Sequence, residues 1–275
     1  MAKFGSIKYQ VVEILKTVNG IGESKKASRE SSGIKSVESG HKVSDKIHSY
    51  KSMDNMRNDL INLGNYAKEN FGVKDISQIH AEHVREWLNS KEISYNTASN
   101  YMSELNKVSD HFNFTKEEIK ELRADLKKEL PKADLETRAY KGLEKIELRP
   151  HTQPAFELQR DYGLRANAST HINLDKQLIG NTLSYQEKGG KWSEKELSPS
   201  LVSKLKENAI EGKYEINKRT YGRDFQKQIE KSGQKYNGTH GIRHTYAQKM
   251  LETHSKAEVS QEMGHSREEI TDTYL

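Results

Sequence analysis

The sequence predicts a mainly α-helical protein with a small antiparallel β-sheet, in the α+β class. Apolar residues recur at helical spacing through most of residues 47–131. Alternation of apolar and polar residues is confined to residues 172–197, where Gly180-Asn181 and Gly189-Gly190 supply turns. Helical spacing then returns and continues to the C-terminus.

Composition sets limits on the protein class. The chain has 275 residues, enough for two modest domains, and a net charge of +5, which permits nucleic-acid binding without requiring it. Cysteine is absent, which excludes disulfides and thiolate metal sites. There is neither an apolar run of about 18 residues nor a signal-peptide pattern, so we expect a cytoplasmic, DNA-associated protein outside the membrane.

The chain is predicted to divide into residues 1–46, 47–131 and 132–275. Residues 4–18 have the pattern of a short amphipathic helix, either an arm that docks on DNA or on another subunit, or a helix packed on its own domain. Residues 20–45 are rich in Ser, Gly and Lys and are predicted to be a flexible basic linker. That linker could wrap DNA through Lys25, Lys26 and Arg29, or act only as a spacer.

Four helices are predicted within residues 47–131. The first carries an apolar stripe from Met53 to Ala67 and ends at Gly72, and the second surrounds Trp87. The third runs from Ala98 to Phe112. The fourth begins at a Thr115–Glu118 capping box and is closed by Pro131. The polar start of the third helix offers either phosphate contacts or ordinary capping groups. The candidate residues there are Tyr95, Asn96, Thr97 and Asn100.

The second domain is predicted to alternate helices with a hairpin. After a charged junction, a helix begins near Thr152 and ends at Gly163. A small sheet follows over residues 172–197, and then helices over 200–210 and 221–231. Thr239 is expected to cap a helix that extends to residue 251, and another ends at Gly264. A capping box of Ser266 and Glu269 then starts a last short helix.

Compact helices can bring His240, Arg243, His265 and Tyr274 together. His240 and Arg243 are three residues apart and share a helix face. A tyrosine hydroxyl can attack phosphorus to form a covalent phosphotyrosine. Fixed guanidinium and imidazole donors can stabilise the negative charge that develops on the phosphate oxygens. This set therefore points to chemistry at a phosphodiester.

The order of these motifs resembles the tyrosine recombinases, the phage-integrase family. HGIRH is followed by GH and then by Tyr274, nine residues after His265, as in the second conserved box of that family. RDYGLRANAS is similar to the first box and places its arginine at Arg165. YQEKGGKWSE is similar to the lysine hairpin and places the catalytic lysine at Lys188, which we favour over Lys191. Four pieces in the right order are more specific than any single one.

The resemblance implies a helical core-binding domain that clamps DNA, followed by a catalytic domain. It implies a site-specific DNA recombinase for integration, excision or resolution, with double-stranded DNA as partner and a tetramer on that DNA. Tyr274 would form a 3′-phosphotyrosyl bond. Arg165, Arg243 and His265 would bind the phosphate, His240 would take the tyrosine proton, and Lys188 would protonate the 5′-oxygen. We add Lys191 to the DNA-binding candidates. No cofactor and no metal would be needed.

Two departures from the family pattern affect these expectations. The family often has an acidic residue three positions after the first-box arginine, where this sequence has Ala168. Its members usually continue past the tyrosine into a helix that docks on another subunit, whereas this sequence stops at Leu275. Assembly would then use another surface, such as the N-terminal arm, or the chain is a trimmed or minimal form.

Other interpretations stay open. A type IB topoisomerase-like enzyme would nick and religate DNA with related residues. A recombinase relative could bind DNA without completing strand exchange. His240 and His244 are four residues apart, the spacing of a zinc pair on a helix, but the usual glutamate and cysteine ligands are missing from this stretch. We therefore predict no metal site.

Overall fold

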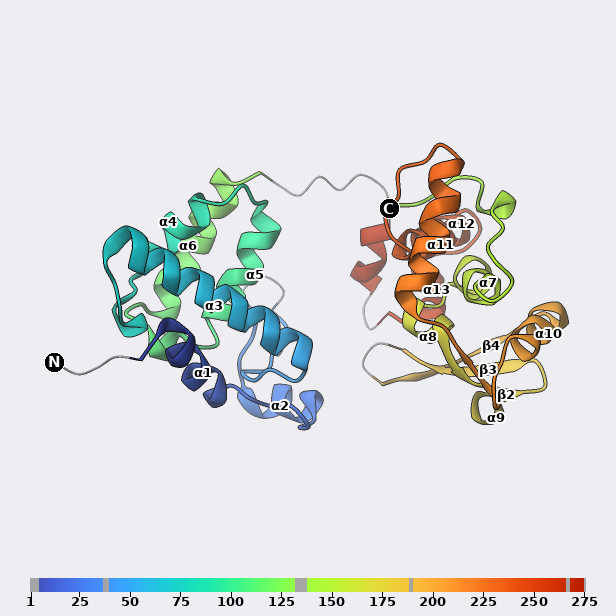
Figure 1. The fold of residues 1–275 in the computed structure, drawn as a ribbon, viewed down its shortest axis with the longest axis horizontal. Helices are drawn as coiled ribbons and strands as arrows, with labels where there is room; N and C mark the ends of the chain where they lie inside the picture. The colour runs from blue at the N-terminus through green and yellow to red at the C-terminus, as the bar shows by residue number, and fades with distance from the viewer. Residues whose placement is uncertain (1–4, 37–39, 132–137, 188–189, 266–267, 275) are drawn as a thin grey trace. The chain divides into compact units, whose positions relative to one another are not determined.

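The computed structural model describes residues 5–36, 40–131, 138–187, 190–265 and 268–274. The chain forms two compact units, Met1–Asp134 and Leu135–Leu275, and each is considered by itself (Figure 1). Over the described ranges, helices dominate both units and the named strands lie in the second, which confirms the predicted fold class. Among the described residues, no helix is long and apolar enough to span a membrane.

Apart from two isolated β-bridges, the regular elements in the described part of the N-terminal unit are all helices. Its elements are α1 (Ile7–Thr17), α2 (Lys25–Ser32), α3 (Tyr50–Phe71), η1 (Ile76–Gln78), α4 (Ala81–Asn89), α5 (Tyr95–Leu105), η2 (Ser109–His111) and α6 (Lys116–Glu129). One apolar core joins them, and it contains residues from α1 as well as from α3 to α6. The fully buried Trp87 and Met56 are among its largest side chains.

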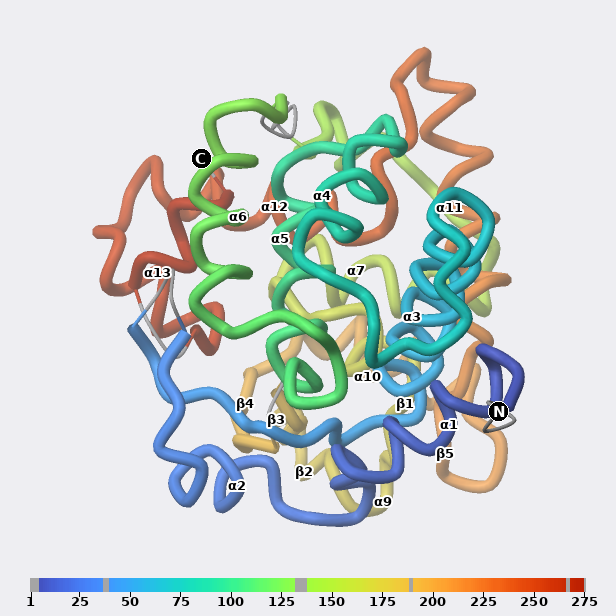
Figure 2. The backbone as a smooth tube through the Cα atoms, turned by 90° about the vertical axis from the view of Figure 1, so that its left-hand side faces the viewer, coloured from blue at the N-terminus to red at the C-terminus, as the bar shows by residue number. Residues whose placement is uncertain are grey.

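For residues 4–18 the structure agrees with the second alternative, a helix packed on its own domain, whereas the predicted linker is helical over residues 25–32. Helix α1 lies against α3, and Val11 is fully buried in the core of the unit (Figures 1 and 2). Residues 25–32 form a helix instead of a flexible linker. The Oγ atoms of Ser28 in this helix and of Ser44 are hydrogen-bonded at 2.5 Å. The predicted division at residue 46 is therefore absent from the structure, because the apolar face of α1 is buried on the helices that follow.

The local signals in the sequence set the ends of the other helices. Gly72 adopts the left-handed conformation (φ 70°) at the end of α3, as predicted. Thr115 and Glu118 form the predicted capping box of α6, and the Thr115 N–H donates to Oε2 of Glu118 over 2.6 Å. The third helix is shorter than predicted: α5 ends at Leu105, and the chain continues through the 3-10 turn η2.

The C-terminal unit surrounds two small sheets with helices. Its helices are η3 (Leu143–Lys145), α7 (Gln153–Tyr162), α8 (Ala166–Thr170), α9 (Leu174–Gln177), α10 (Pro199–Glu207), α11 (Lys218–Lys231), α12 (His240–Leu251), α13 (Lys256–Glu262) and η4 (Glu268–Tyr274). Its strands are β1 (His171–Asn173), β2 (Leu178–Ile179), β3 (Thr182–Gln186), β4 (Trp192–Glu196) and β5 (Lys213–Glu215).

The sheet prediction was right for the hairpin and incomplete for its surroundings. Strands β2, β3 and β4 form an antiparallel sheet, with Tyr185 opposite Ser193. Strand β1 was expected to continue into the same sheet. It instead pairs with β5, because the helical turn α9 separates it from β2. The partner strand β5 lies some forty residues after β1 in the sequence. Alternation of apolar and polar residues within one segment does not reveal such a distant partner, so the second sheet was not predicted.

Two apolar clusters hold this unit together. The larger one joins α7, α10, α11 and the sheets, and buries Phe156, Tyr214 and Phe225. The smaller one packs α12, α13 and η4 around Tyr246, Val259 and Tyr274. Thr239 precedes α12 as predicted, but its side chain makes no capping hydrogen bond. The predicted capping box at Ser266 lies outside the described residues.

Candidate functional site

Arg243 is the most buried charged residue of the candidate site. It lies in the first turn of α12, with 1% of its surface exposed. Its Nη1 donates to the Gly163 carbonyl and its Nη2 to the Met263 carbonyl. Arg243 therefore links the ends of α7 and α13, and its guanidinium is held from two sides.

Two glycines shape the backbone around that guanidinium. Gly163 ends α7 with φ of 65°, and a Cβ there would lie 2.5 Å from the ring of Tyr246. Gly264 follows α13 with φ of 61°, and a Cβ there would lie 2.8 Å from the carboxyl carbon of Glu187. Both positions combine a left-handed backbone with a close approach, so glycine alone fits them without a shift.

Arg165 begins α8 and forms an ion pair with Glu187, which directly follows β3. The Arg165 side chain is 25% exposed and that of Glu187 only 2%. Partial burial lowers the pKa of Arg165, and the charge of Arg243 lowers it further. The two arginines therefore lie close enough to repel each other, with a buried carboxylate beside one of them.

Three histidine rings surround the ring of Tyr274. Its ring centroid is 4.4 Å from that of His244, 5.3 Å from that of His265 and 5.8 Å from that of His240. Tyr274 is 4% exposed. Its carbonyl accepts a 2.8 Å hydrogen bond from Nε2 of Gln248 on α12, which ties the end of η4 to that helix.

Partial burial lowers the pKa of His240 to about 4, and His244, Arg243, Arg165 and Arg138 lower it further by their charge. The pKa of His265 is also lowered to about 4, first by burial and then by Arg243 and Arg165. Both imidazoles are therefore neutral near pH 7.

Three buried polar atoms around the site have no hydrogen-bond partner among the described residues. They are Nε of Arg243, Nε2 of His265 and Oε1 of Glu187. Nδ1 of His265 contacts Oγ1 of Thr271 at 2.9 Å, which leaves Nε2 as its second hydrogen-bonding atom. Buried groups of this kind are uncommon in folded proteins and are often found where a ligand binds.

The structure thus brings together five of the six predicted catalytic residues: Arg165, His240, Arg243, His265 and Tyr274. The sixth, Lys188, lies outside the described residues. Lys191 is exposed on the same hairpin, directly before β4. The grouping joins α8, α12, the loop after α13 and η4, which are far apart in sequence but packed in one unit.

Sequence reasoning missed two residues of this site. Glu187 stands directly before Lys188, and only the pairing of the strands and the approach of α8 show that it contacts Arg165. His244 was considered as a possible zinc partner of His240, but its buried ring lies against Tyr274. The helical spacing of His244, one turn after His240, was the only available signal.

The polar turn predicted to contact DNA begins α5. Asn96 and Asn100 are exposed there, whereas Tyr95 and Thr97 are half-buried. Thr97 and Asn100 line a hollow together with Asp59 and Glu104. Burial and the neighbouring Asp59 raise the pKa of Glu104 to about 8. This carboxyl pair makes the hollow a poor place for a phosphate when both groups are ionised.

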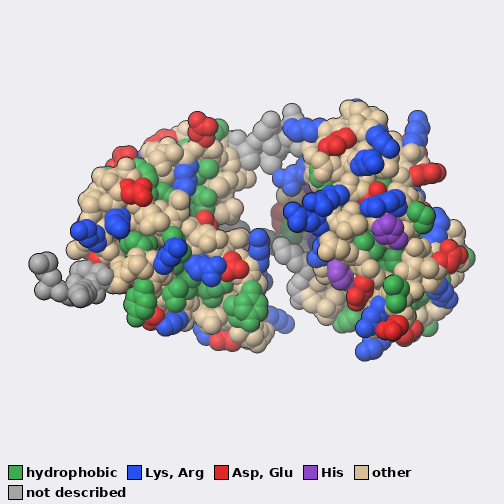
Figure 3. All heavy atoms as spheres, viewed as in Figure 1, with side chains coloured by type: hydrophobic (Ala, Val, Ile, Leu, Met, Phe, Trp, Pro, Cys, Tyr) green, Lys and Arg blue, Asp and Glu red, His purple; other side chains and the backbone are tan. Residues whose placement is uncertain are grey.

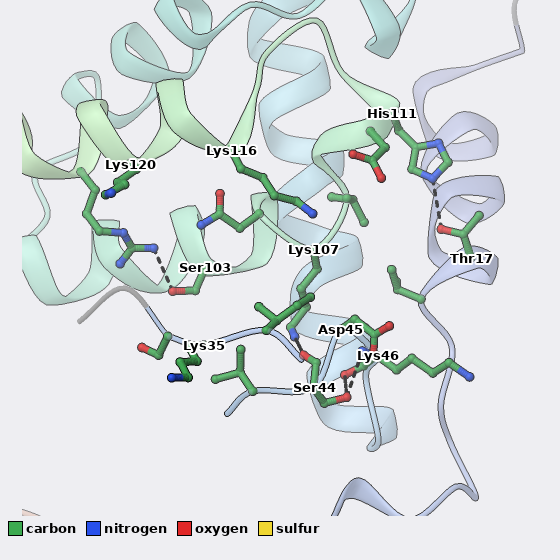
Figure 4. Close-up of a pocket in the computed structure, with 18 of the residues that line it drawn as sticks. Thr17, Lys35, Ser44, Asp45, Lys46, Ser103, Lys107, His111, Lys116 and Lys120 are labelled. Carbon is green, nitrogen blue, oxygen red and sulfur yellow. Dashed lines mark hydrogen bonds between the residues drawn. The ribbon is translucent and has the colours of Figure 1, made fainter. Parts of the chain in front are cut away.

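A larger cavity of about 640 Å³ opens elsewhere on the N-terminal unit, between residues 34–36, residues 43–46 and the start of α6. Asp45, Asp110 and Glu117 line it, and cationic side chains from separate segments line it as well (Figure 4). These cationic residues are Lys35, Lys46, Lys107, Lys116, Lys120 and Arg123. Burial lowers the pKa of Lys107, whose Nζ donates to the Ser44 carbonyl. Lys116 and Lys120 are exposed.

Charge is otherwise mixed over the surface. Figure 3 shows Lys and Arg side chains among Asp and Glu on the visible face of each unit. Within the described residues, no group of three or more His, Asp or Glu side chains is placed to hold a metal ion.

The sequence matches no protein-family model and no curated protein. Its structure is similar to that of the XerH site-specific recombinase bound to difH substrate, with a TM-score of 0.64 and 15% identity over 98% of this chain and 92% of that chain. It is also similar to a lambda integrase (75–356) dimer bound to a COC′ core site, with a TM-score of 0.63 and 13% identity over 98% of this chain and 95% of that chain. For the Tn1549 transposon integrase in complex with transposon right end DNA, the TM-score is 0.58 and the identity 14%, over 98% of this chain and 95% of that chain. The chain therefore has the fold of the tyrosine recombinases.

Proposed function

We propose that the protein is a site-specific DNA recombinase of the tyrosine type, which breaks and rejoins DNA strands through a covalent phosphotyrosine. One observation carries the proposal. The fold brings two arginines and three histidines around a single tyrosine, in a protein whose structural relatives include recombinases bound to DNA.

In the proposed reaction, the Oη of Tyr274 attacks a DNA phosphate and forms a phosphotyrosyl bond at the 3′ side. The bond from phosphorus to the 5′-oxygen breaks and leaves a free 5′-hydroxyl. The tyrosine proton passes to His240, and the 5′-oxygen takes a proton from Lys188. Attack of a 5′-hydroxyl on the phosphotyrosine reverses these steps and rejoins a strand.

The charge around Tyr274 supports these roles. Arg243 has a buried Nε and His265 a buried Nε2 with no partner among the described residues, and both are donors suited to phosphate oxygens. His240 is neutral near pH 7 because its pKa is lowered to about 4, so it can accept a proton. Arg165 adds a second guanidinium with part of its surface exposed.

We further propose that the N-terminal unit contributes to DNA binding. The cavity lined by residues 34–36, residues 43–46 and the start of α6 presents exposed Lys116 and Lys120. Its cationic side chains outnumber its carboxylates, Asp45, Asp110 and Glu117, as expected of a surface that binds phosphates without reading sequence. Homo-oligomeric assembly on DNA, as a tetramer, belongs to the same proposal. The exposed Lys191 next to the hairpin turn is a further DNA contact.

Covalent capture tests the proposed function. The protein is mixed with nicked DNA fragments from its source genome, without added metal, denatured and separated on a gel. We expect a protein–DNA adduct that is absent with Tyr274→Phe and present with Tyr214→Phe, a control on a buried tyrosine of the same unit that lies in the other apolar cluster. Sequencing the captured DNA would then identify the site.

Other results would exclude site-specific recombination. Relaxation of any supercoiled plasmid would indicate a type IB topoisomerase-like enzyme. DNA binding without an adduct, from protein with an unchanged melting temperature, would indicate a relative that binds DNA and does not cleave it.

A further inference from the structure

We propose that Glu187 is the positioning residue for Arg165, and that the hairpin thereby supplies the carboxylate that α8 lacks. The proposal rests on the proposed function, since Arg165 matters here as a phosphate ligand. The segment after Arg165 reads Ala166-Asn167-Ala168-Ser169-Thr170 and contains no acidic residue. Its charge partner comes instead from the chain 22 residues later.

The burial of the two partners shows from which side the contact is made. The Glu187 side chain is 2% exposed, whereas that of Arg165 is 25% exposed. The carboxylate therefore contacts the guanidinium from within the protein, and the exposed part of Arg165 remains open to a ligand. A carboxylate that competed with phosphate would instead lie on the open side.

Glu187 is itself fixed by its neighbours. Its backbone N–H donates to the Lys191 carbonyl over 2.7 Å and closes the described end of the hairpin. Gly264, the residue before His265, approaches the Glu187 carboxyl so closely that a Cβ at position 264 would lie 2.8 Å from it. Glu187 therefore contacts two parts of the site, Arg165 on α8 and the backbone that leads to His265.

The other strand of the hairpin is also attached to the site. Nζ of Lys195 on β4 donates to Glu262 at the end of α13, and Tyr246 of α12 donates to the same carboxylate over 2.9 Å. With Glu187 directly after β3 and Lys195 on β4, the hairpin is anchored to the start of α8 at one point and to α12 and α13 at another.

The energetics favour a positioning role. A buried carboxylate is costly to keep unless it is paired, and its removal leaves the partner charge uncompensated. Arg165 and Arg243 repel each other, which would drive an unpaired Arg165 away from the site. A shift of about 1 Å in a catalytic group is enough to slow a reaction strongly.

The test is single-turnover cleavage of a captured DNA site. We expect Glu187→Gln to slow adduct formation by about tenfold to hundredfold, the usual effect of losing a group that orients a catalytic residue. DNA affinity should stay at the wild-type value. Glu187→Asp, which keeps the charge, should retain more of the rate. Glu157→Gln is the matched control, because it removes a buried carboxylate of the same unit that pairs with Lys204.

A double-mutant cycle separates positioning from a general loss of structure. If Glu187 acts through Arg165, then Glu187→Gln adds little to the rate loss already caused by Arg165→Lys. Independent, multiplying effects would overturn the proposal. So would a wild-type rate in Glu187→Gln, or a faster one, which would make Glu187 a competitor of the phosphate.

A second measurement does not depend on catalysis. Arginine side-chain NMR of the DNA-free protein should show a protected Nη1–H signal for Arg165, the group that donates to Glu187, and this signal should broaden in Glu187→Gln and be unchanged in Glu157→Gln. An unchanged Arg165 signal in Glu187→Gln would overturn the proposal. If the wild type forms no adduct with DNA, that result counts against the proposed function. The NMR measurement then still shows whether Glu187 holds Arg165 in place.

Discussion

The ring of His265 stacks on the ring of Tyr274, with their centroids 5.3 Å apart and their planes 23° apart. Nδ1 of the same histidine contacts Oγ1 of Thr271, three residues before the tyrosine. His265 is thus fixed to η4 by a ring contact and a hydrogen bond. Protonation of the histidine would therefore place a positive charge against the ring of the tyrosine.

The histidines provide a test by pH. We expect His240 and His265 of the DNA-free protein to titrate near pH 4, because burial and the arginines lower both pKa values from 6.5. The unfolded chain takes up these protons first as the pH falls, so stability is lost between about pH 6.5 and pH 4. Imidazole NMR checks this, with signals assigned by His240→Gln and His265→Gln. Midpoints above pH 6 would contradict it.

Arg243→Lys tests the fork geometry of the buried arginine. Lysine keeps the charge but cannot reach the carbonyls of Gly163 and Met263 while also serving a phosphate. We expect adduct formation to slow by about 10²- to 10³-fold, as when one oxyanion donor is removed. Single-turnover assays measure the rate. Arg160→Lys, on a residue that pairs with Asp161, should stay near the wild type.

Lys116 and Lys120 test the cationic cavity of the N-terminal unit. The double variant Lys116→Ala/Lys120→Ala should weaken DNA binding for all sequences alike and reduce the slope of log K against log salt by about 2. Fluorescence anisotropy at several salt concentrations measures both. Lys127→Ala/Lys128→Ala removes the same charge from the other end of α6, and an equal loss in that control would show a general charge effect.

Val11 and Val12 test whether α1 belongs to the core. Val11 is 0% exposed and Val12 is 42% exposed. We expect Val11→Ala to lower the free energy of unfolding by about 2 kcal/mol, because it leaves a cavity. Val12→Ala should stay within about 0.5 kcal/mol of the wild type. Chemical denaturation measures both, and equal small effects would mean that α1 is a free arm.

Glu104 tests the buried carboxyl pair. Its pKa is raised to about 8, first by burial and then by Asp59, so the folded state holds a proton that the unfolded state has lost above about pH 4.5. Stability should therefore fall as the pH rises toward 8. In Glu104→Gln, melting temperatures should depend less on pH in this range and exceed the wild type most at pH 8. An unchanged pH dependence would contradict this.

Much of the fold could be predicted because it depends on local signals. The end of α3 at Gly72 and the start of α6 at Thr115 follow from the glycine backbone and the capping box. The β3–β4 hairpin follows from strict alternation and a glycine turn. Tyr274, His265 and Arg243 could be singled out because their spacing along the chain carries the resemblance.

Tertiary structure decided what depends on contacts between distant segments. Whether α1 is an arm or a core helix depends on the face that α3 offers it, and the sequence was compatible with both. The pairing of β1 with β5 depends on the path of the chain between them. The Arg165–Glu187 pair, the ring of His244 against Tyr274 and the carbonyls around Arg243 arise only when helices and hairpin pack together, since burial and close approach are properties of the assembled unit.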